Sequence, residues 1–377
     1  MREQTPARIA LAGAGGFGRT HLHLVQALHE AGLARLVAVC DVSRPDPEVA
    51  GWLSARSIPW FAEFDRMMTD VATEVVVIAT PPQFHAGMLC TAYSAGCDAL
   101  VEKPPVVTVA QFDEVEAAGA GHLCQVGFQA LGSWAVPRLR HLVDSGELGR
   151  VDLVSAGGCW VRGDRYYLRA PWAGRRMLGG WTVNDGALTN AFAHAVNACL
   201  AVAGVERLGE ARVAADLYRA HDIEGHDTGS VRVELPGHPT VLVAVTLCAS
   251  ETEDPWLMVR GDRGRVRWEY LRDSIEVRDA GGERVERGPR MVLLKNLLAV
   301  RSGAAPDLLA PFSRQRAFVE LCDRLLASPV REVPESAVRR RSTDGDRLTE
   351  IVGVAASTKR AAENGLLYRE TGAAWLT

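Results

Sequence analysis

The first third of the chain alternates between short apolar runs and segments in which apolar residues recur every three or four positions. Arg8–Gly13 is an apolar run, and the glycine-rich segment Gly13–Gly18 connects it to His21–Leu28, whose apolar spacing is helical. Further apolar runs, separated by plausible helices, follow at Leu36–Asp41, Glu74–Thr80 and Asp98–Val101. Strands that are buried on both faces have this composition. The alternation predicts a parallel, doubly wound α/β sheet with right-handed crossovers.

The pattern changes after a helix expected at Val109–Ala118 and a strand expected at His122–Phe128. Val151–Trp160 then has the composition of a strand, and Ala187–Ala203 has helical spacing. Successive strands with turn residues between them are expected at Arg212–Ala215, Gly229–Leu235, Val241–Cys248, Leu257–Arg260 and Gly264–Tyr270. We therefore expect one domain over residues 1–125 and a second α/β domain over residues 126–377, built on a largely antiparallel, open sheet.

The end of the chain is less regular. Phe312–Leu326 and Leu348–Ala362 have helical spacing and are expected to form two late helices. The second of them, placed within residues 344–364, has no feature that assigns it to either domain. Gly288–Asp307 shows no clear period and is expected to be a long loop.

The position of the glycine-rich segment makes it stronger evidence for a nucleotide-binding turn. Gly13, Gly15 and Gly18 have the spacing GxGxxG between a predicted strand and a predicted helix, and Asp41 follows 23 residues after Gly18 at the end of the second strand. In the dinucleotide fingerprint the glycines permit a tight turn, close approach of a pyrophosphate and close helix packing, while the carboxylate binds the adenosine ribose. The sequence thus predicts a Rossmann domain that binds NAD. Arg44 is near enough in sequence to leave NADP open.

Composition excludes several classes of protein. With 42 basic and 46 acidic side chains and a net charge of −4, the chain has no surplus of positive charge for nucleic acid. No apolar segment opens the sequence and no run of 18 apolar residues interrupts it, so we expect a cytoplasmic protein with no membrane partner. The eight cysteines are scattered without Cys-x-x-Cys spacing, which predicts reduced core residues, no metal site and no zinc-dependent alcohol dehydrogenase.

Lysine is nearly absent from the chain. Lys103, Lys295 and Lys359 stand against 39 arginines. Arginine can supply positive charge at any position but cannot lose its proton, whereas a partly desolvated lysine can. Lys103 lies in Glu102-Lys103-Pro104-Pro105, directly after a predicted strand. It is therefore a candidate for proton transfer, and the alternative is that it is one remaining surface lysine among three.

Three further segments together resemble one family. Thr80-Pro81-Pro82-Gln83-Phe84-His85, Glu102-Lys103-Pro104 and a helix segment that ends at His194 resemble the glucose-fructose oxidoreductase, inositol dehydrogenase and MocA family, over nearly the whole chain. The resemblance implies that the lysine turn lies beside the nicotinamide and binds the reacting oxygen of a sugar or cyclitol. It also implies a homo-oligomer, a dimer or tetramer. Cofactor contacts are expected from Gly13, Gly15, Gly16, Phe17, Gly18, Asp41, Arg44, Thr80, Pro81, His85, Glu102 and Lys103.

The second catalytic pattern of that family is an aspartate four residues before a histidine, and here Asn190 occupies the place of the aspartate before His194. Spacing of four on one helix would put both side chains on the same face. An amide can orient a hydroxyl group but cannot take up a proton, and it does not favour a protonated histidine as a carboxylate would. Asn197 stands where the family often has another aspartate, so a second negative charge is missing here. The alternative for His194 is an ordinary core histidine.

Arginines are concentrated between Arg162 and Arg176, where five of them are interleaved with aromatic residues. Aromatic faces suit sugar rings, and guanidinium groups suit carboxylates and phosphates. A uronate, sugar phosphate or nucleotide-linked sugar is therefore one hypothesis for the substrate, and a solvated basic loop is the alternative. Substrate contacts are expected from Arg165, Tyr166, Trp172 and Gln129.

Together these features predict hydride transfer between NAD(P) and a secondary hydroxyl or keto carbon of a sugar, cyclitol or related polyol. Lys103 and His194 would transfer protons and Asn190 would position the substrate. Two alternatives stay open. One is a lyase or glycosidase that oxidises its substrate transiently and then returns the hydride. The other is a sensor that binds NAD and a sugar without turnover, which the missing aspartate favours.

Overall fold

The computed structural model describes residues 6–376, and the chain divides into two compact units. The first unit comprises Met1–Gly127 and Val292–Ser313, and the second comprises Phe128–Met291 and Arg314–Thr377. The first unit thus includes a segment from the last third of the chain, which the expected division at residues 125 and 126 assigned to the second domain. Within the described residues, no helix is both long and apolar enough to cross a bilayer.

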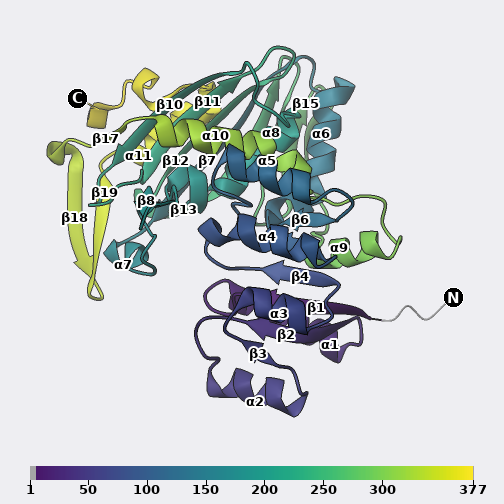
Figure 1. Cartoon of the computed structure of the whole chain (residues 1–377). Helices are drawn as coiled ribbons and strands as arrows, with labels where there is room; N and C mark the ends of the chain where they lie inside the picture. Colours follow the sequence, from purple (N-terminus) through teal and green to yellow (C-terminus); the bar gives the residue numbers. More distant parts are fainter. Residues whose placement is uncertain (1–5, 377) are drawn as a thin grey trace. The chain divides into compact units, whose positions relative to one another are not determined.

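Six parallel strands form the sheet of the first unit in the order β3-β2-β1-β4-β5-β6 (Figure 1). The strands are β1 (Ala7–Ala12), β2 (Ala34–Cys40), β3 (Trp60–Phe61), β4 (Val75–Ile78), β5 (Asp98–Val101) and β6 (Cys124–Val126). The helices are α1 (Gly18–Glu30), α2 (Pro47–Ala55), α3 (Phe64–Asp70), α4 (His85–Ser94) and α5 (Val109–Ala118). Strands β4 and β5 are buried throughout, which explains their continuous apolar runs. The predicted doubly wound sheet is confirmed, and its order reverses between β1 and β4.

The expected loop at Gly288–Asp307 is wrong, because it contains helix α9 (Leu293–Arg301). Fully buried Gln125 of β6 donates through Nε2 to the carbonyl of Leu293 at 3.2 Å and to Oδ1 of Asn296 at 2.6 Å. Arg301 forms ion pairs with Glu74 and Asp98. The helix is short and no side chain caps its first turn, so it lacked the start signal that would have identified it.

The second unit contains a sheet of nine strands in the order β16-β15-β14-β13-β7-β12-β11-β10-β17. Only the pairs β7–β12 and β10–β17 are parallel, so the expected largely antiparallel sheet is confirmed. The strands are β7 (Val151–Val161), β10 (Arg212–Arg219), β11 (Thr228–Glu234), β12 (Thr240–Thr246), β13 (Cys248–Gly261), β14 (Arg265–Glu269), β15 (Ser274–Asp279), β16 (Gly282–Arg287) and β17 (Val330–Glu332). The longer helices are α6 (Ala135–Ser145), α8 (Ala193–Ala203), α10 (Arg316–Ala327) and α11 (Val354–Asn364).

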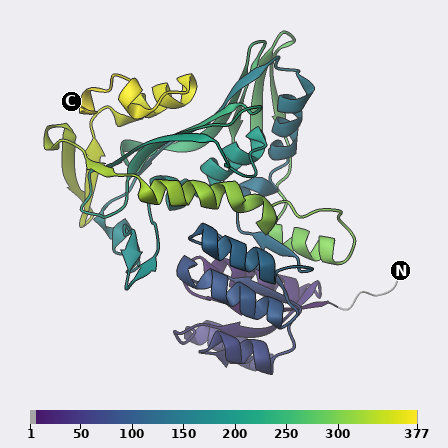
Figure 2. The same ribbon diagram turned by 45° about the horizontal axis from the view of Figure 1, so that its top comes forward.

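Two adjacent glycines of β7 let helices approach both faces of this sheet. A Cβ on Gly158 would lie 3.0 Å or less from the ring of Phe192, and a Cβ on Gly157 would lie 3.3 Å from Ala362 of α11. Successive residues of a strand point to opposite faces, so α8 and α11 pack on opposite sides. In Figure 2 the C-terminal helices, drawn in yellow, lie on one side of the curved sheet and α10 on the other.

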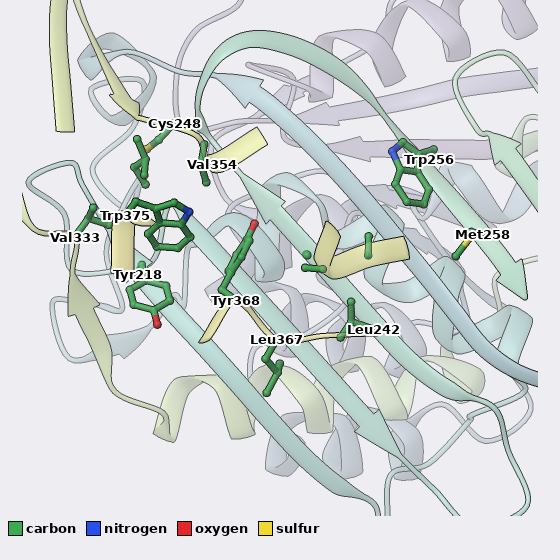
Figure 3. Packing of buried hydrophobic residues seen from close by; sticks show 14 of the residues in the cluster. Tyr218, Leu242, Cys248, Trp256, Met258, Val333, Val354, Leu367, Tyr368 and Trp375 are labelled. Atoms are coloured by element: carbon green, nitrogen blue, oxygen red, sulfur yellow. The ribbon is translucent and has the colours of Figure 1, made fainter. Parts of the chain in front are cut away.

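The C-terminal segment closes the main core of the second unit. Figure 3 shows Tyr218, Tyr368 and Trp375 grouped above the strands, with ring centroids 5.2 Å apart for Tyr218–Trp375 and 5.3 Å for Tyr368–Trp375. All three rings are buried, and such aromatic groups contribute a large part of core stability. Val354, Ala361 and Ala362 of α11 belong to the same cluster, so α11 packs in the second unit.

The expected helix at Leu348–Ala362 is wrong in its first part. Leu348–Ile351 belongs to β19 (Asp346–Ile351), which pairs with β18 (Val338–Thr343) in an exposed hairpin. Its turn is Asp344-Gly345, and both residues have positive φ, as the two-residue hairpin turns require. The Asp-Gly pair was the turn signal. All eight cysteines are unpaired and all but Cys90 are buried, as expected.

Candidate functional site

The glycine turn after β1 cannot carry side chains at its two ends. Gly13 has φ +84°, and a Cβ there would lie 2.6 Å from the carbonyl oxygen of Ala79, which follows β4. A Cβ on Gly18 would overlap the carbonyl oxygen of Gly13. At Gly15, by contrast, the nearest atom is 3.9 Å away. The first and last glycines therefore close the turn, and the middle one leaves open backbone.

Helix α1 begins at this turn with a free approach for an anion. No side chain caps its N-terminus at Phe17, and its first turn has no acidic residue. The carboxylate of Asp41 accepts the N–H groups of Ala14 at 2.8 Å and Gly15 at 3.2 Å through Oδ2, and that of Ser43 at 2.9 Å through Oδ1. An uncapped helix N-terminus beside open glycine backbone fits a pyrophosphate, and a carboxylate beside it fits a ribose. Arg44 lies exposed in the same loop. These residues fit a dinucleotide.

Lys103 follows β5 in a turn that contacts of the buried Glu102 side chain stabilise. Glu102 is buried, its Oε1 lies 2.8 Å from Nε2 of buried His21, and its Oε2 accepts the backbone N–H of Lys103 at 3.2 Å. Gly127 makes room for it, since a Cβ there would lie 2.5 Å from Oε1. The Lys103–Pro104 peptide bond is cis. Glu102 was expected to contact the cofactor, and the structure places it beneath the lysine turn as a support.

A second buried histidine connects this turn to the loop after β4. The ring of His85 is fully buried, with Nδ1 2.9 Å from the carbonyl oxygen of Pro104 and Nε2 2.8 Å from that of Thr80. Burial lowers the pKa of His85, and the two carbonyl contacts oppose that shift. Pro81 starts the short turn (Pro82–Phe84) that leads into α4. His85 thus holds the two loops at the carboxyl edge of the sheet together.

In the second unit, the helix expected at Ala187–Ala203 is two pieces. Asn190 lies in a π-helical turn (Ala187–Ala191), and α8 begins only at Ala193. Phe192 lies between them, and its ring packs on Trp160 with centroids 4.2 Å apart. The assumption of one continuous α-helix behind the shared face of Asn190 and His194 was therefore wrong. Single π-helical turns occur often at functional sites.

Sequence reasoning missed the carboxylate that binds Asn190. Oδ1 of Asp185 lies 2.6 Å from Nδ2 of Asn190, and its Oδ2 accepts the N–H of Gly174 at 2.6 Å. Arg169 approaches Oδ2 at 3.5 Å. Asp185 was the only carboxylate in the segment that contains the Asn190 and His194 motif, but its distance of five residues from Asn190 matches no α-helical pair.

His194 lies in the first turn of α8, and its half-buried ring meets Phe128 edge to face, with centroids 5.9 Å apart. Gln129 lies in the short turn (Gln129–Gly132) that follows Phe128 and is half-buried. Both residues belong to the second unit, as does Asn190. Lys103 and the glycine turn belong to the first unit. The expected site residues are thus divided between the two units.

His226 supports the π-helical turn from the interior. Its Nε2 accepts the N–H of Leu188 at 3.0 Å, and its carbonyl accepts that of Ala187 at 2.7 Å. The ring is buried against Gly186, whose Cβ would overlap it. Burial lowers the pKa of His226 to about 4, and the neutral ring is the form that can accept this hydrogen bond.

Replacing His226 with glutamine is expected to remove part of the acid sensitivity of the protein. Because the folded-state pKa of His226 is below its unfolded value, its contribution is complete above pH 6.5 and is lost as pH falls toward 4. Between pH 7 and pH 5 the loss amounts to about 2 kcal/mol of unfolding free energy. Denaturant unfolding of both proteins at the two pH values measures it, and an equal pH dependence would contradict the assignment.

The arginine-rich segment mostly binds the protein itself. Arg169 stacks on Tyr166 at 3.8 Å and on Trp172 at 4.8 Å. Arg175 pairs with Glu224, and Arg176 donates to the carbonyl of Ser328. Arg162 stacks on Trp160 and Tyr166, and Arg165 is exposed. The guanidinium of Arg162 also donates to the carbonyl of adjacent Val161 at 3.0 Å, and Arg165 donates its backbone N–H to Oδ1 of Asp346 at 3.0 Å. Most guanidinium groups of this segment therefore already bind other groups of the protein, which leaves few of them for an acidic substrate.

The structure groups three potential metal ligands, where the sequence predicted none. His221, Asp227 and Cys248 are buried, and Nδ1 of His221 lies 3.0 Å from Oδ2 of Asp227 and 3.4 Å from Sγ of Cys248. Burial first, and then the charge of Asp227, raise the pKa of the Cys248 thiol. We interpret the group as a hydrogen-bonded core cluster with a protonated thiol, since Nδ1–H can donate to both partners.

Two family models match consecutive parts of the chain. Residues 7–128 match the oxidoreductase family with an NAD-binding Rossmann fold, and residues 136–267 match the GFO/IDH/MocA C-terminal domain. Inositol 2-dehydrogenase of Rhodococcus erythropolis is 32% identical over 154 residues, which is 40% of this chain and 43% of that protein. The chain thus spans less than half the length of the curated relatives it matches.

Solved structures with this fold include two dehydrogenases. The WlbA dehydrogenase from Bordetella pertussis, in complex with NADH and UDP-GlcNAcA, has a TM-score of 0.69 at 20% identity, over 86% of this chain and 96% of that chain. Levoglucosan dehydrogenase, in complex with NADH and levoglucosan, has a TM-score of 0.66 at 17% identity over the same shares. These likenesses show the fold of both units. Because both family models match, the chain belongs to the Gfo/Idh/MocA oxidoreductase family, and its first unit contains an NAD-binding Rossmann domain.

Proposed function

We propose that this chain is an NAD-dependent oxidoreductase that moves a hydride between the nicotinamide and a secondary carbinol carbon of a sugar, cyclitol or related polyol. One observation carries the proposal. The amine of half-buried Lys103 follows β5 at the carboxyl edge of the sheet, where the glycine turn also lies, and Glu102 and His85 hold its turn. Ligands of open α/β sheets bind at this edge, at the point where the strand order reverses.

This reaction requires a group that can stabilise negative charge on the carbinol oxygen and transfer its proton. When the carbinol is oxidised, its C–H hydride leaves to the nicotinamide and its O–H proton passes to a base. Lys103 would hold that oxygen and move its proton, His194 would serve as the second proton-transfer group, and Asn190 would orient a substrate hydroxyl. Bound NAD supplies the hydride acceptor, which no side chain can provide.

The relatives support a polyhydroxylated substrate. A cyclitol is named for the inositol dehydrogenase, a neutral sugar derivative for the levoglucosan enzyme and an acidic nucleotide sugar for WlbA. The aromatic faces of Tyr166 and Trp172 suit a sugar ring. Because most arginines nearby already have protein partners, neutral sugars and cyclitols are the preferred class.

The test is a panel of neutral sugars, cyclitols, glycosides and acidic sugars, with nicotinamide absorbance and product release followed together. Net NADH formation with a neutral polyol is the expected result. Product without net NADH would favour the redox-neutral lyase or glycosidase. Binding of NAD and sugar with neither signal would favour a sensor, and turnover of acidic members alone would overturn the preferred substrate class.

A further inference from the structure

The side-chain amide of Asn190 has one chemically defined orientation. It lies 2.6 Å from Oδ1 of Asp185, and a carboxylate can only accept hydrogen bonds, so the facing group is the NH₂. Asp185 is only 4% exposed, whereas Asn190 is half-buried. The carboxylate of the pair therefore lies in the interior, and the neutral amide lies nearer the surface of the second unit.

Asp185 is itself held from three directions. Its Oδ2 accepts the N–H of Gly174 and lies 3.5 Å from Arg169, which stacks on Tyr166. Its own N–H donates to the carbonyl of Arg175 at 2.8 Å. A buried carboxylate needs this set of donors and a positive partner to offset its desolvation.

The residue before Asp185 has an uncommon backbone conformation. Asn184 has φ +47°, a left-handed conformation that is uncommon outside glycine. Its Nδ2 donates to the carbonyl of Cys322 at 2.9 Å, and its carbonyl accepts the hydroxyl of Thr189 at 2.6 Å. Strain of this kind persists where surrounding contacts determine it, and it is concentrated at functional sites.

We propose that Asp185 is a positioning residue that fixes the orientation of the Asn190 side-chain amide at the proposed substrate site. The carboxylate of this pair is the buried member, and the less buried member is the uncharged amide. This inference rests on the proposed function. It gives Asn190 a fixed orientation and leaves proton transfer to Lys103 and His194.

The test is an exchange of the two side chains. In Asp185→Asn two amides face each other, and in Asn190→Asp two carboxylates share a site made for one, so each single variant should lose about ten- to a hundredfold in kcat/KM with NAD affinity unchanged. The double variant Asp185→Asn/Asn190→Asp restores one carboxylate and one amide, and it should recover most of the loss. Asp164→Asn is the matched control. It removes a carboxylate that pairs with Arg347, and it should behave as wild type.

The pH profile separates positioning from a purely structural role. The pH profile of kcat/KM should keep its shape in the single variants if Asp185 acts by positioning, because proton transfer stays with Lys103 and His194, and their melting temperatures should match that of the wild type. Full activity of a folded Asp185→Asn, or a double variant that is folded and no better than the single ones, would overturn the inference. If the wild type reduces no nicotinamide with any polyol, the proposed function fails and this inference with it. A wild type that turns over while the single variants match it defeats the inference alone.

Discussion

Arginine in place of Lys103 is expected to leave NAD binding intact and to lower turnover by about a hundredfold or more, the range in which positioned acid–base groups act. Arginine preserves the positive charge, and the contacts from Glu102 and His85 are made to the turn's backbone, so the first unit should keep its shape. What is lost is an amine that can exchange its proton, because a guanidinium does not deprotonate in proteins. Calorimetric titration with NAD and steady-state turnover of the best polyol measure the two effects separately.

The other two lysines are matched controls for this change. Lys295 and Lys359 are exposed, whereas Lys103 is half-buried. Lys295→Arg and Lys359→Arg should therefore leave both NAD affinity and turnover unchanged, since surface substitutions of this kind alter stability by about 0.5 kcal/mol or less. A fully active Lys103→Arg would show that only positive charge is required at this position, and Lys103 would then lose its role in proton transfer.

Alanine at Gly15 is expected to weaken NAD binding by about tenfold or more without unfolding the protein. Gly15 does not have a positive φ, and the nearest atom to an added Cβ is Oδ2 of Asp41 at 3.9 Å, so the free chain accommodates the methyl group. The open backbone is where a pyrophosphate must approach, and the methyl group would occupy that space. Thermal melting of the free protein and NAD titration, performed on the same preparation, give the two results.

Two further glycines calibrate this effect. Gly13→Ala should unfold or strongly destabilise the first unit, because φ is +84° and the Cβ would lie 2.6 Å from the carbonyl oxygen of Ala79. Gly51→Ala lies inside α2 with no atom within 4 Å of the new Cβ, and it should stabilise by about 1 kcal/mol or less with unchanged NAD affinity. If Gly15→Ala binds NAD as tightly as Gly51→Ala does, the glycine turn is not the pyrophosphate site.

Local patterns predicted the first unit well because its strands and its two turns are each formed by consecutive residues. The buried strands read as apolar runs, and the glycine turn and the lysine turn each directly follow a strand. Gln125 shows the limit of this approach. It is a polar residue in a buried strand, and its purpose becomes visible only when it binds Leu293 and Asn296, more than 160 residues later.

The second unit was harder to predict because its site is built from breaks in periodicity. Helical spacing across Ala187–Ala203 concealed a π-helical turn that ends at Phe192, and an α-helical argument then paired Asn190 with His194. The partner that the structure gives Asn190 is Asp185, which is held by a left-handed residue before it and a loop N–H from Gly174. Neither leaves a periodic signal in the sequence. Residue identities predicted the candidates, and only the fold showed how one of them is positioned.

The most direct test of the account is a single-turnover measurement of nicotinamide absorbance with the wild type, one equivalent of NAD and an excess of each polyol. Reduced nicotinamide should appear with at least one neutral sugar or cyclitol, whether it persists or is consumed again, and with Lys103→Arg it should appear about a hundredfold more slowly or not at all. Protein that binds NAD yet forms no reduced nicotinamide with any member of the panel, or equal rates for wild type and Lys103→Arg, would contradict the assignment of hydride transfer at the Lys103 turn.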